Sequence, residues 1–279
     1  MVGARIAREP RMVRRAGRLL NRPTSVFFFT HHKCASTFVP RMLRLAAGDQ
    51  YTHVDYGASL WRYPNDVLDR HPSYEAFFES AHPMLFEPRG HIYGPHRAPF
   101  SFSGMFDYRA IFFLRDPRDV LVSWYYSTAF THETPRDRVL KEQFAAGRSQ
   151  ALDASIDEFV LGWSRTYFKD VFDKYREMRE LFRSSVFVSY DQFRRSPIDT
   201  ASAIYAFLGV TPPAGPVSRL AGAAQPTRSA IRLEHKRSGR SGQFAHELRP
   251  ETVEALNATF AGHLRYWGFE SGHGESAAL

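Results

Sequence analysis

Cysteine and long apolar runs are both scarce in this chain. Its 279 residues include a single cysteine, Cys34, which excludes an internal disulfide and argues against zinc or iron–sulfur sites built on cysteine. No apolar run approaches the roughly 20 residues that cross a bilayer, and the N-terminus lacks the apolar stretch of a signal peptide. We therefore expect a cytoplasmic protein without a metal centre.

Positive charge is concentrated at the N-terminus. Residues 1–22 carry seven arginines and one glutamate, while the whole chain has a formal net charge of +8. As a helix, this segment would be basic on one side and apolar on the other, which is typical of helices that rest on an anionic membrane. Gly3, Pro10 and Gly17 weaken such a helix. We expect a frayed tail over 1–22, with weak membrane-surface contact as the alternative, and no nucleic-acid partner.

Short apolar runs alternate with helical patterns along the rest of the chain. The runs at 25–30, 109–114 and 185–189 are rich in β-formers, and each is followed by a turn and a helical pattern. This alternation is typical of an α/β fold with a largely parallel sheet. We expect one domain over 23–270, followed by a C-terminal tail over 271–279.

Capping residues predict several helix boundaries. Asp116 before Pro117 marks a helix start, and Ser155 with Glu158 forms a capping box. Residues 211–249 are rich in proline, glycine, serine and arginine, and we expect no regular structure there. Helices are expected over about 36–47, 117–129, 155–183, 197–209 and from 250 onward.

The loop after the first predicted strand has the chemistry of an anion site. A short loop that enters a helix N-terminus presents backbone N–H groups and the positive end of the helix dipole. Lys33 adds a positive charge, and Ser36 and Thr37 add hydroxyl donors. The Walker A pattern GxxxxGK[ST] is absent. An ordinary strand-to-helix turn is the alternative interpretation.

A second candidate anion site follows the strand at 109–114. Arg115 leaves the strand end, and Ser123 lies about two turns into the next helix, so both could hold one phosphate group. Asp116 is better interpreted as the helix cap than as a catalytic acid. Both sites should lie at the carboxyl edge of a parallel sheet, where ligands bind.

Four motifs in this order resemble those of the cytosolic-type sulfotransferases. They are TxxKxxSTF at 30–38, RDPRDVLVSWYYS at 115–127, YDQFRRSP at 190–197 and RSGRSGQF at 237–244. The resemblance covers most of the chain. It implies a three-layer P-loop-like α/β fold, with a mostly parallel sheet flanked by helices. The implied donor is 3′-phosphoadenosine 5′-phosphosulfate (PAPS), and the implied product is adenosine 3′,5′-bisphosphate (PAP).

Site residues carry over from the family position by position. Lys33 would neutralise the leaving phosphate oxygen, and a histidine after an apolar strand, His96, would accept the acceptor's proton; His31 and His32 are the reserves. The candidate catalytic residues are Lys33, His96 and Ser123. The candidate cofactor-binding residues are Lys33, Cys34, Ala35, Ser36, Thr37, Phe38, Arg115, Ser123, Tyr190, Arg237, Ser238 and Gly239.

Several of these positions depart from the family pattern or have a plain structural alternative. Cys34 and Ala35 replace the usual Ser-Gly, which makes the loop less compliant, and Ser238 replaces a lysine. Phe38, in place of the usual tryptophan, would stack on adenine and Tyr190 would contact the base. Core packing is the alternative for both aromatic residues.

The resemblance implies in-line transfer of a sulfuryl group to a hydroxyl or amine, with no metal required. A small molecule, a lipid and a glycan all remain open as the acceptor, as does the oligomeric state. The aromatic segment 51–86 could line the acceptor site, with 130–151 as a lid. The rival functions are a P-loop kinase-like phosphotransferase and a non-catalytic protein that binds nucleotide, polyanion or nucleic acid.

Overall fold

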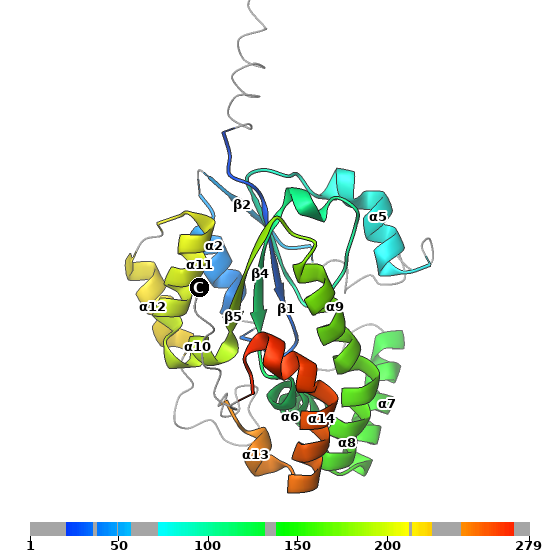
Figure 1. Ribbon diagram of the computed structural model, residues 1–279. Coiled ribbons are helices and arrows are strands. Elements are labelled where there is room, and N and C mark those ends of the chain that lie inside the picture. Colours follow the sequence, from blue (N-terminus) through cyan, green and yellow to red (C-terminus); the bar gives the residue numbers. More distant parts are fainter. Residues whose placement is uncertain are drawn as a thin grey trace, which may run out of the picture.

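The computed structural model describes residues 21–35, 38–48, 50–56, 72–131, 138–211, 214–224 and 241–270, and a parallel sheet lies at their centre (Figure 1). The strand order is β2-β3-β1-β4-β5, and every neighbouring pair is parallel. The strands are β1 (Val26–Thr30), β2 (Thr52–Val54), β3 (His91–His96), β4 (Arg109–Leu114) and β5 (Ser184–Ser189). The three strands predicted from apolar runs are confirmed as β1, β4 and β5.

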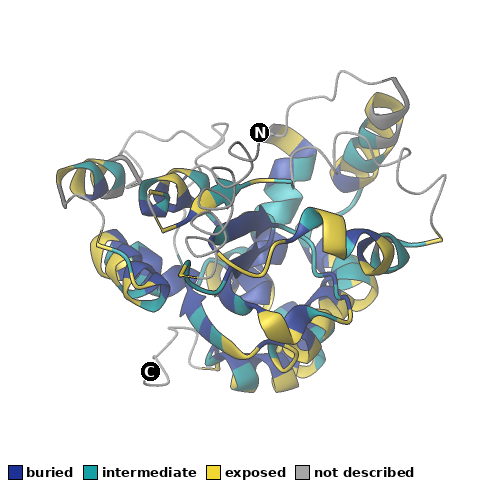
Figure 2. Ribbon diagram, turned by 90° about the horizontal axis from the view of Figure 1, so that it is seen from above, coloured by how far each residue is buried: buried dark blue, intermediate teal, exposed yellow. Residues whose placement is uncertain are grey.

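Helices cover both faces of the sheet, as the predicted three-layer arrangement requires. The alternation along β1 places Phe27 and Phe29 in one buried cluster and Phe28 in the other. The Phe28 side is covered by α2 (Val39–Ala46), α10 (Tyr190–Arg195), α11 (Pro197–Leu208) and α12 (Ala214–Ala224). The other side is covered by α5 (Tyr74–Leu85), α6 (Pro117–Tyr126), α7 (Arg138–Asp153), α8 (Ile156–Trp163), α9 (Lys169–Arg179), α13 (Phe244–Glu247) and α14 (Pro250–Trp267). Burial is concentrated in the sheet and on the helix faces that contact it (Figure 2).

The predicted caps form as the side-chain chemistry requires. The Asp116 carboxylate accepts the N–H of Arg118 at 2.9 Å and begins α6. Ser155 and Glu158 make both hydrogen bonds of the capping box at the start of α8. Gly209 ends α11 in the left-handed conformation, with φ 74°. These local signals were sufficient to predict the helix boundaries, because each capping residue acts within one turn of its helix.

Two predicted helices contain a wider turn, and the predicted irregular segment contains helices. The helix expected over 155–183 runs as α8, a π-helical turn η3 (Ser164–Phe168) and α9, and α6 is followed by a π-helical turn η2 (Ser127–Thr131). The expectation that 211–249 lacks regular structure is wrong for its described parts, which hold α12 and α13. Val217 explains α12, because it is buried in the cluster shared with α2 and α11.

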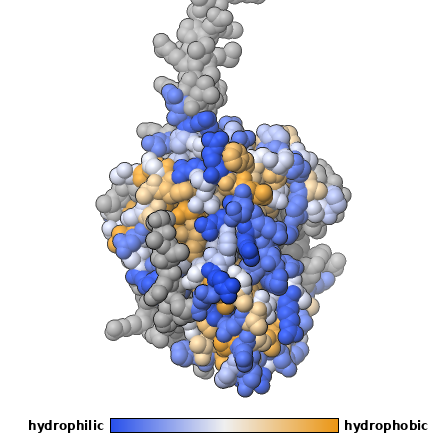
Figure 3. Space-filling model, viewed as in Figure 1, coloured by the Kyte–Doolittle hydropathy of each residue, from blue (hydrophilic) through white to orange (hydrophobic). Residues whose placement is uncertain are grey.

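Among the described residues, no helix is long and apolar enough to cross a membrane. On the face in Figure 3, hydrophilic side chains form a broad band, with smaller apolar groups beside it. The basic tail lies outside the described residues, apart from its last two positions, and so does 271–279. The division into tail, domain and tail therefore stays a prediction.

Candidate active site

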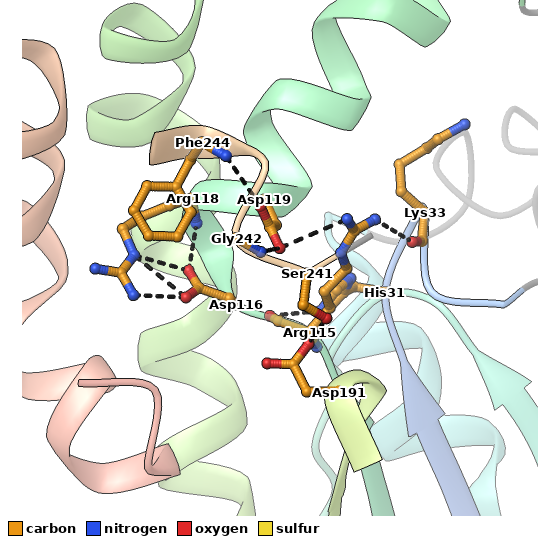
Figure 4. Close-up of polar contacts among 10 residues, drawn as sticks. All are labelled: His31, Lys33, Arg115, Asp116, Arg118, Asp119, Asp191, Ser241, Gly242 and Phe244. Atoms are coloured by element: carbon orange, nitrogen blue, oxygen red, sulfur yellow. Dashed lines mark hydrogen bonds and ion pairs between the residues drawn. The ribbon is translucent and has the colours of Figure 1, made fainter. Parts of the chain in front are cut away.

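The two predicted anion-site segments meet at the carboxyl edge of the sheet. Strands β1 and β4 are neighbours, with Thr30 paired to Phe113, so the segments that follow them lie side by side. A guanidinium nitrogen of Arg115, Nη1, donates to the carbonyl oxygen of Lys33 at 3.4 Å (Figure 4). The two predicted anion-site segments are therefore in direct contact through the Arg115 side chain and the Lys33 backbone.

His31 ties these two segments together through its ring. Its Nε2 accepts the backbone N–H of Arg115 at 2.9 Å, and its Nδ1 lies 2.8 Å from the carbonyl oxygen of His32. An acceptor at Nε2 and a donor at Nδ1 define a neutral ring that carries its proton on Nδ1. Burial lowers the pKa of His31 to about 4, which keeps the ring neutral. Both nitrogens are therefore engaged by backbone groups.

The Lys33 loop is held in an uncommon backbone conformation. Lys33 and Ala35 have φ values of 68° and 46°, in the left-handed region that costs a non-glycine residue about 1–2 kcal/mol. The Lys33 side chain extends away from Arg115, while its carbonyl faces the guanidinium (Figure 4). Burial, with added repulsion from Arg115 and Arg97, lowers the pKa of Lys33 to about 8. An anion bound beside it would restore the charged form.

Arg115 is buried and is positioned from three directions. It lies over the Tyr190 ring, with 4.6 Å from the guanidinium carbon to the ring centre. Its Nη2 is 3.6 Å from a carboxylate oxygen of Asp119, one turn along α6. Together with the Lys33 carbonyl, these contacts fix a positive group at the end of β4 with little freedom to move.

Two acidic residues hold the segment that leads into α13. Fully buried Asp119 accepts the backbone N–H of Gly242 at 2.8 Å and that of Phe244 at 3.2 Å. The hydroxyl of Ser241 donates to Asp191 at the start of α10. The chain therefore re-enters the described part beside Arg115, at Ser241, four positions after Arg237.

Asp116 and Arg118 serve the fold on the other side of α6. Arg118 donates charged hydrogen bonds to Asp116 from Nε at 3.0 Å and from Nη2 at 2.6 Å. It also donates to Asn257 at 2.6 Å and to the carbonyl of Phe269 at 2.8 Å. Its side chain points toward α14, opposite to that of Arg115 (Figure 4). The interpretation of Asp116 as a cap is confirmed.

His96 lies at the end of β3, enclosed by aromatic rings. Its ring centre is 5.6 Å from that of Phe29 and 4.9 Å from that of Phe100. The Nε2 atom is buried and has no hydrogen-bond partner within the described residues. Burial lowers the pKa of His96 to about 3, so the imidazole is neutral. A neutral ring with an unpaired nitrogen can accept a proton.

A family model of the sulfotransferase domain matches residues 23–268. This chain belongs to the sulfotransferase family. The match confirms the prediction of a sulfotransferase. No curated protein matches the sequence significantly.

Solved structures of similar fold include mouse sulfotransferase SULT7A1 complexed with PAP, at a TM-score of 0.52 and 12% identity, covering 90% of this chain and 88% of that one. Retinol dehydratase in a complex with retinol and PAP matches at a TM-score of 0.47 and 15% identity, covering 92% of this chain and 86% of that one. Retinol dehydratase in complex with androsterone and PAP matches at a TM-score of 0.49 and 14% identity, covering 88% of this chain and 81% of that one. The similarity to the mouse enzyme supports the P-loop-like α/β fold.

Other predicted donor-site residues of this sulfotransferase have plain packing contacts. The Cys34 thiol is buried and donates to the Phe113 carbonyl at 3.4 Å. Phe38 is buried with its ring centre 4.6 Å from that of Phe193, and Ser123 is half-buried on α6. Adenine stacking by Phe38 stays a prediction. Ser36, Thr37, Arg237, Ser238 and Gly239 lie outside the described residues.

The sequence interpretation missed an aromatic group beside the Lys33 loop. Trp124 on α6 lies 5.1 Å from the His32 ring centre and 6.1 Å from that of Trp163 on α8. Tyr167, in the π-helical turn η3, lies 6.0 Å from Trp163. The indole Nε1 of Trp124 is buried without a partner within the described residues. Such π-helical turns often mark functional sites. The sequence did not predict this turn, so the signal became available only with the structure.

The segment proposed to line an acceptor site is partly core. Tyr51 is buried and donates to the Leu208 carbonyl at 3.2 Å, and Phe78 stacks on Phe100 at 3.8 Å. These two side chains stabilise the fold. Trp61 and Tyr63 lie outside the described residues. No group of three potential metal ligands occurs among the described residues.

Proposed function

We propose that this sulfotransferase binds PAPS across the ends of β1 and β4. Lys33 would contact the phosphosulfate end, and Arg115, with Ser123, the 3′-phosphate. The observation that carries this proposal is the 3.4 Å contact between Arg115 Nη1 and the Lys33 carbonyl. Bound PAPS carries several negative charges that the two cations would neutralise, so catalysis would rely mainly on positioning and charge neutralisation.

His96 is the proposed general base. Its Nε2 has no hydrogen-bond partner among the described residues, whereas both nitrogens of His31 are engaged by backbone groups. The acceptor oxygen attacks sulfur, the bond from sulfur to the 5′-phosphate oxygen breaks, and the acceptor's proton passes to His96. Lys33 supports the charge left on the phosphate oxygen. The low pKa of His96 makes it a weak base, so the proton moves late, once the attacking oxygen has become acidic.

The acceptor is proposed to be a small molecule with an apolar body. The aromatic group of Trp124, Trp163 and Tyr167 supports this assignment, because aromatic side chains bind apolar ligand surface and the unpaired Trp124 N–H offers one polar contact. A glycan would instead require a row of polar side chains.

The test is sulfuryl transfer from radiolabelled PAPS to a metabolite extract, with the product identified by mass. Lys33→Ala and His96→Ala should each lower transfer at least ~100-fold. PAP binding should survive in His96→Ala and weaken in Lys33→Ala. Arg165→Ala, at an exposed position on η3, is the control and should retain transfer.

Arg115→Lys tests the 3′-phosphate assignment, because it keeps the charge and loses the planar fork. It should weaken the binding of PAP at least ~10-fold more than the binding of adenosine 5′-phosphosulfate, which lacks the 3′-phosphate. Tight PAPS binding with no transfer to any acceptor would favour the non-catalytic alternative. A protein that binds neither PAPS nor PAP would contradict the proposed donor site.

A further inference from the structure

Arg97 occupies the position directly after the proposed base. Strand β3 is the neighbour of β1 on the side away from β4, and His96 is paired with Phe29 across this boundary. Arg97 therefore leaves β3 at the carboxyl edge, next to the loop that contains Lys33. Its side chain is half-buried. Three adjacent strand ends thus contribute one cation each: Arg97, Lys33 and Arg115.

The Arg97 guanidinium has no hydrogen-bond, ion-pair or ring partner among the described residues, whereas Arg115 and Arg118 are each held by a carboxylate. Its charge is close enough to Lys33 to contribute to the lowered pKa of that lysine. Two repelling cations at one edge are unfavourable unless an anion lies between them. The arrangement is therefore complementary to a bound anion.

We propose that Arg97 is a further catalytic residue that contacts the sulfuryl oxygens of the donor. This inference rests on the proposed function, which places the phosphosulfate at Lys33. The sulfuryl group is transferred between the acceptor oxygen and the 5′-phosphate oxygen, so it lies between the base His96 and Lys33. Arg97 follows His96 directly and lies beside Lys33, at the same stretch of the edge.

The chemistry of the transfer suits a guanidinium at this point. As the bond from sulfur to the 5′-phosphate oxygen breaks, its electron pair stays on that phosphate oxygen, which Lys33 neutralises. The new bond forms from the acceptor oxygen to sulfur, and the acceptor's proton goes to His96. The three sulfuryl oxygens share one negative charge in both the donor and the product, and a planar fork of N–H donors can contact two of them at once.

Two nucleotides that differ only by the sulfuryl group test this assignment. PAP and PAPS are titrated into the protein without acceptor, so that PAPS is not consumed. Arg97→Gln should leave the Kd of PAP within about twofold and weaken PAPS about tenfold, the loss expected for one charge-assisted contact. Transfer to an acceptor should fall more than PAPS binding does. Arg97→Lys should recover part of both losses.

Arg89→Gln is the matched control, because Arg89 lies just before the opposite end of β3 and is exposed. It should behave as the unmodified protein in both titrations. Equal weakening of PAP and PAPS by Arg97→Gln would place Arg97 on the nucleotide phosphates and overturn the proposal, as would an unchanged affinity for PAPS. An unmodified protein that binds neither nucleotide would instead overturn the proposed function.

Discussion

The Nε2 atom of His31 accepts the backbone N–H of Arg115 across the boundary between β1 and β4, at 2.9 Å. The same ring approaches the carbonyl of His32 with Nδ1, at 2.8 Å. One neutral side chain thus fixes the spacing between the loop that holds Lys33 and the end of β4. We expect His31, a reserve candidate for the base, to position these two segments, because both of its ring nitrogens contact backbone groups.

Replacing His31 tests this role. His31→Leu removes the acceptor for the Arg115 N–H, and a buried unpaired N–H costs about 1–3 kcal/mol. We expect the Kd of PAP to rise at least ~5-fold, because the distance between the two anion sites is no longer fixed. Calorimetric titration measures the change.

His31→Gln is the matched variant, since its amide oxygen can accept the same N–H. It should retain PAP affinity within about threefold of the unmodified protein. If His31→Leu and His31→Gln weaken PAP binding equally, the hydrogen bond does not position the site and the ring acts through its shape alone.

The free energy of unfolding should fall on acidification. Burial lowers the folded-state pKa of His31 to about 4 and of His96 to about 3, from 6.5. Below pH 6.5, these two histidines therefore bind protons in the unfolded chain but not in the folded chain. Stability is full above pH 6.5 and declines toward pH 4. At pH 5 each histidine contributes a loss of about 2 kcal/mol.

Urea unfolding at pH 7 and pH 5 measures this loss. His96→Gln cannot take up the proton, so its stability should decline less between the two pH values than that of the unmodified protein. An equal decline in both proteins would show that other groups control acid unfolding.

Local chemistry explains how much of the fold was predictable. Asp116 and Ser155 start helices through hydrogen bonds within one turn, so sequence alone placed these boundaries. Strand β1 was equally clear, since five consecutive residues are buried. Helix α12 was missed because its glycines and its proline are poor helix formers, and its packing against α2 through the buried Val217 depends on residues far along the chain.

Motifs in the sequence supplied the candidate site residues, whereas contacts between distant parts of the chain are seen only in the structure. Lys33 and Arg115 came from motifs, and their proximity followed from the order of parallel strands. The role of His31 depends on a residue 84 positions away. The predicted contribution of Cys34 could not be judged from sequence, because only the structure shows its side chain turned to the core.

Nucleotide binding should weaken at alkaline pH. Burial, with Arg115 and Arg97 nearby, lowers the pKa of Lys33 to about 8, so the free protein loses this charge as the pH rises through 8. The Kd of PAP should therefore increase between pH 8 and pH 9.5, by up to about tenfold per pH unit. Titrations at fixed ionic strength measure it. Lys33→Arg keeps its charge in this range, so a similar rise in that variant would assign the effect elsewhere.

Substitutions of Asp116, the N-cap of α6, and of Asp119, in its first turn, should have different effects. Asp119→Asn places an amide N–H₂ beside two backbone donors and should cost about 1–3 kcal/mol of stability. It should also weaken PAP, because Asp119 orients Arg115 and the segment entering α13. Asp116→Asn breaks the pair with Arg118 and should cost about 3 kcal/mol.

Urea unfolding and PAP titration of both variants separate these roles. The Asp116 variant should bind PAP within about twofold of the unmodified protein, because Arg118 points toward α14. Weakening of PAP by both variants to the same extent would refute the assignment of Asp116 to the fold alone.

The single thiol gives a one-site readout of the Lys33 loop. Burial raises the pKa of Cys34 to about 12, and the Sγ atom donates to the Phe113 carbonyl, so very little reactive thiolate is present at neutral pH. A maleimide should label the native protein at least ~1,000-fold more slowly than the urea-unfolded chain. PAP should slow native labelling further if nucleotide binding stabilises the loop. Rapid labelling of the native protein would mean that the loop opens readily and that the thiol is exposed to the site.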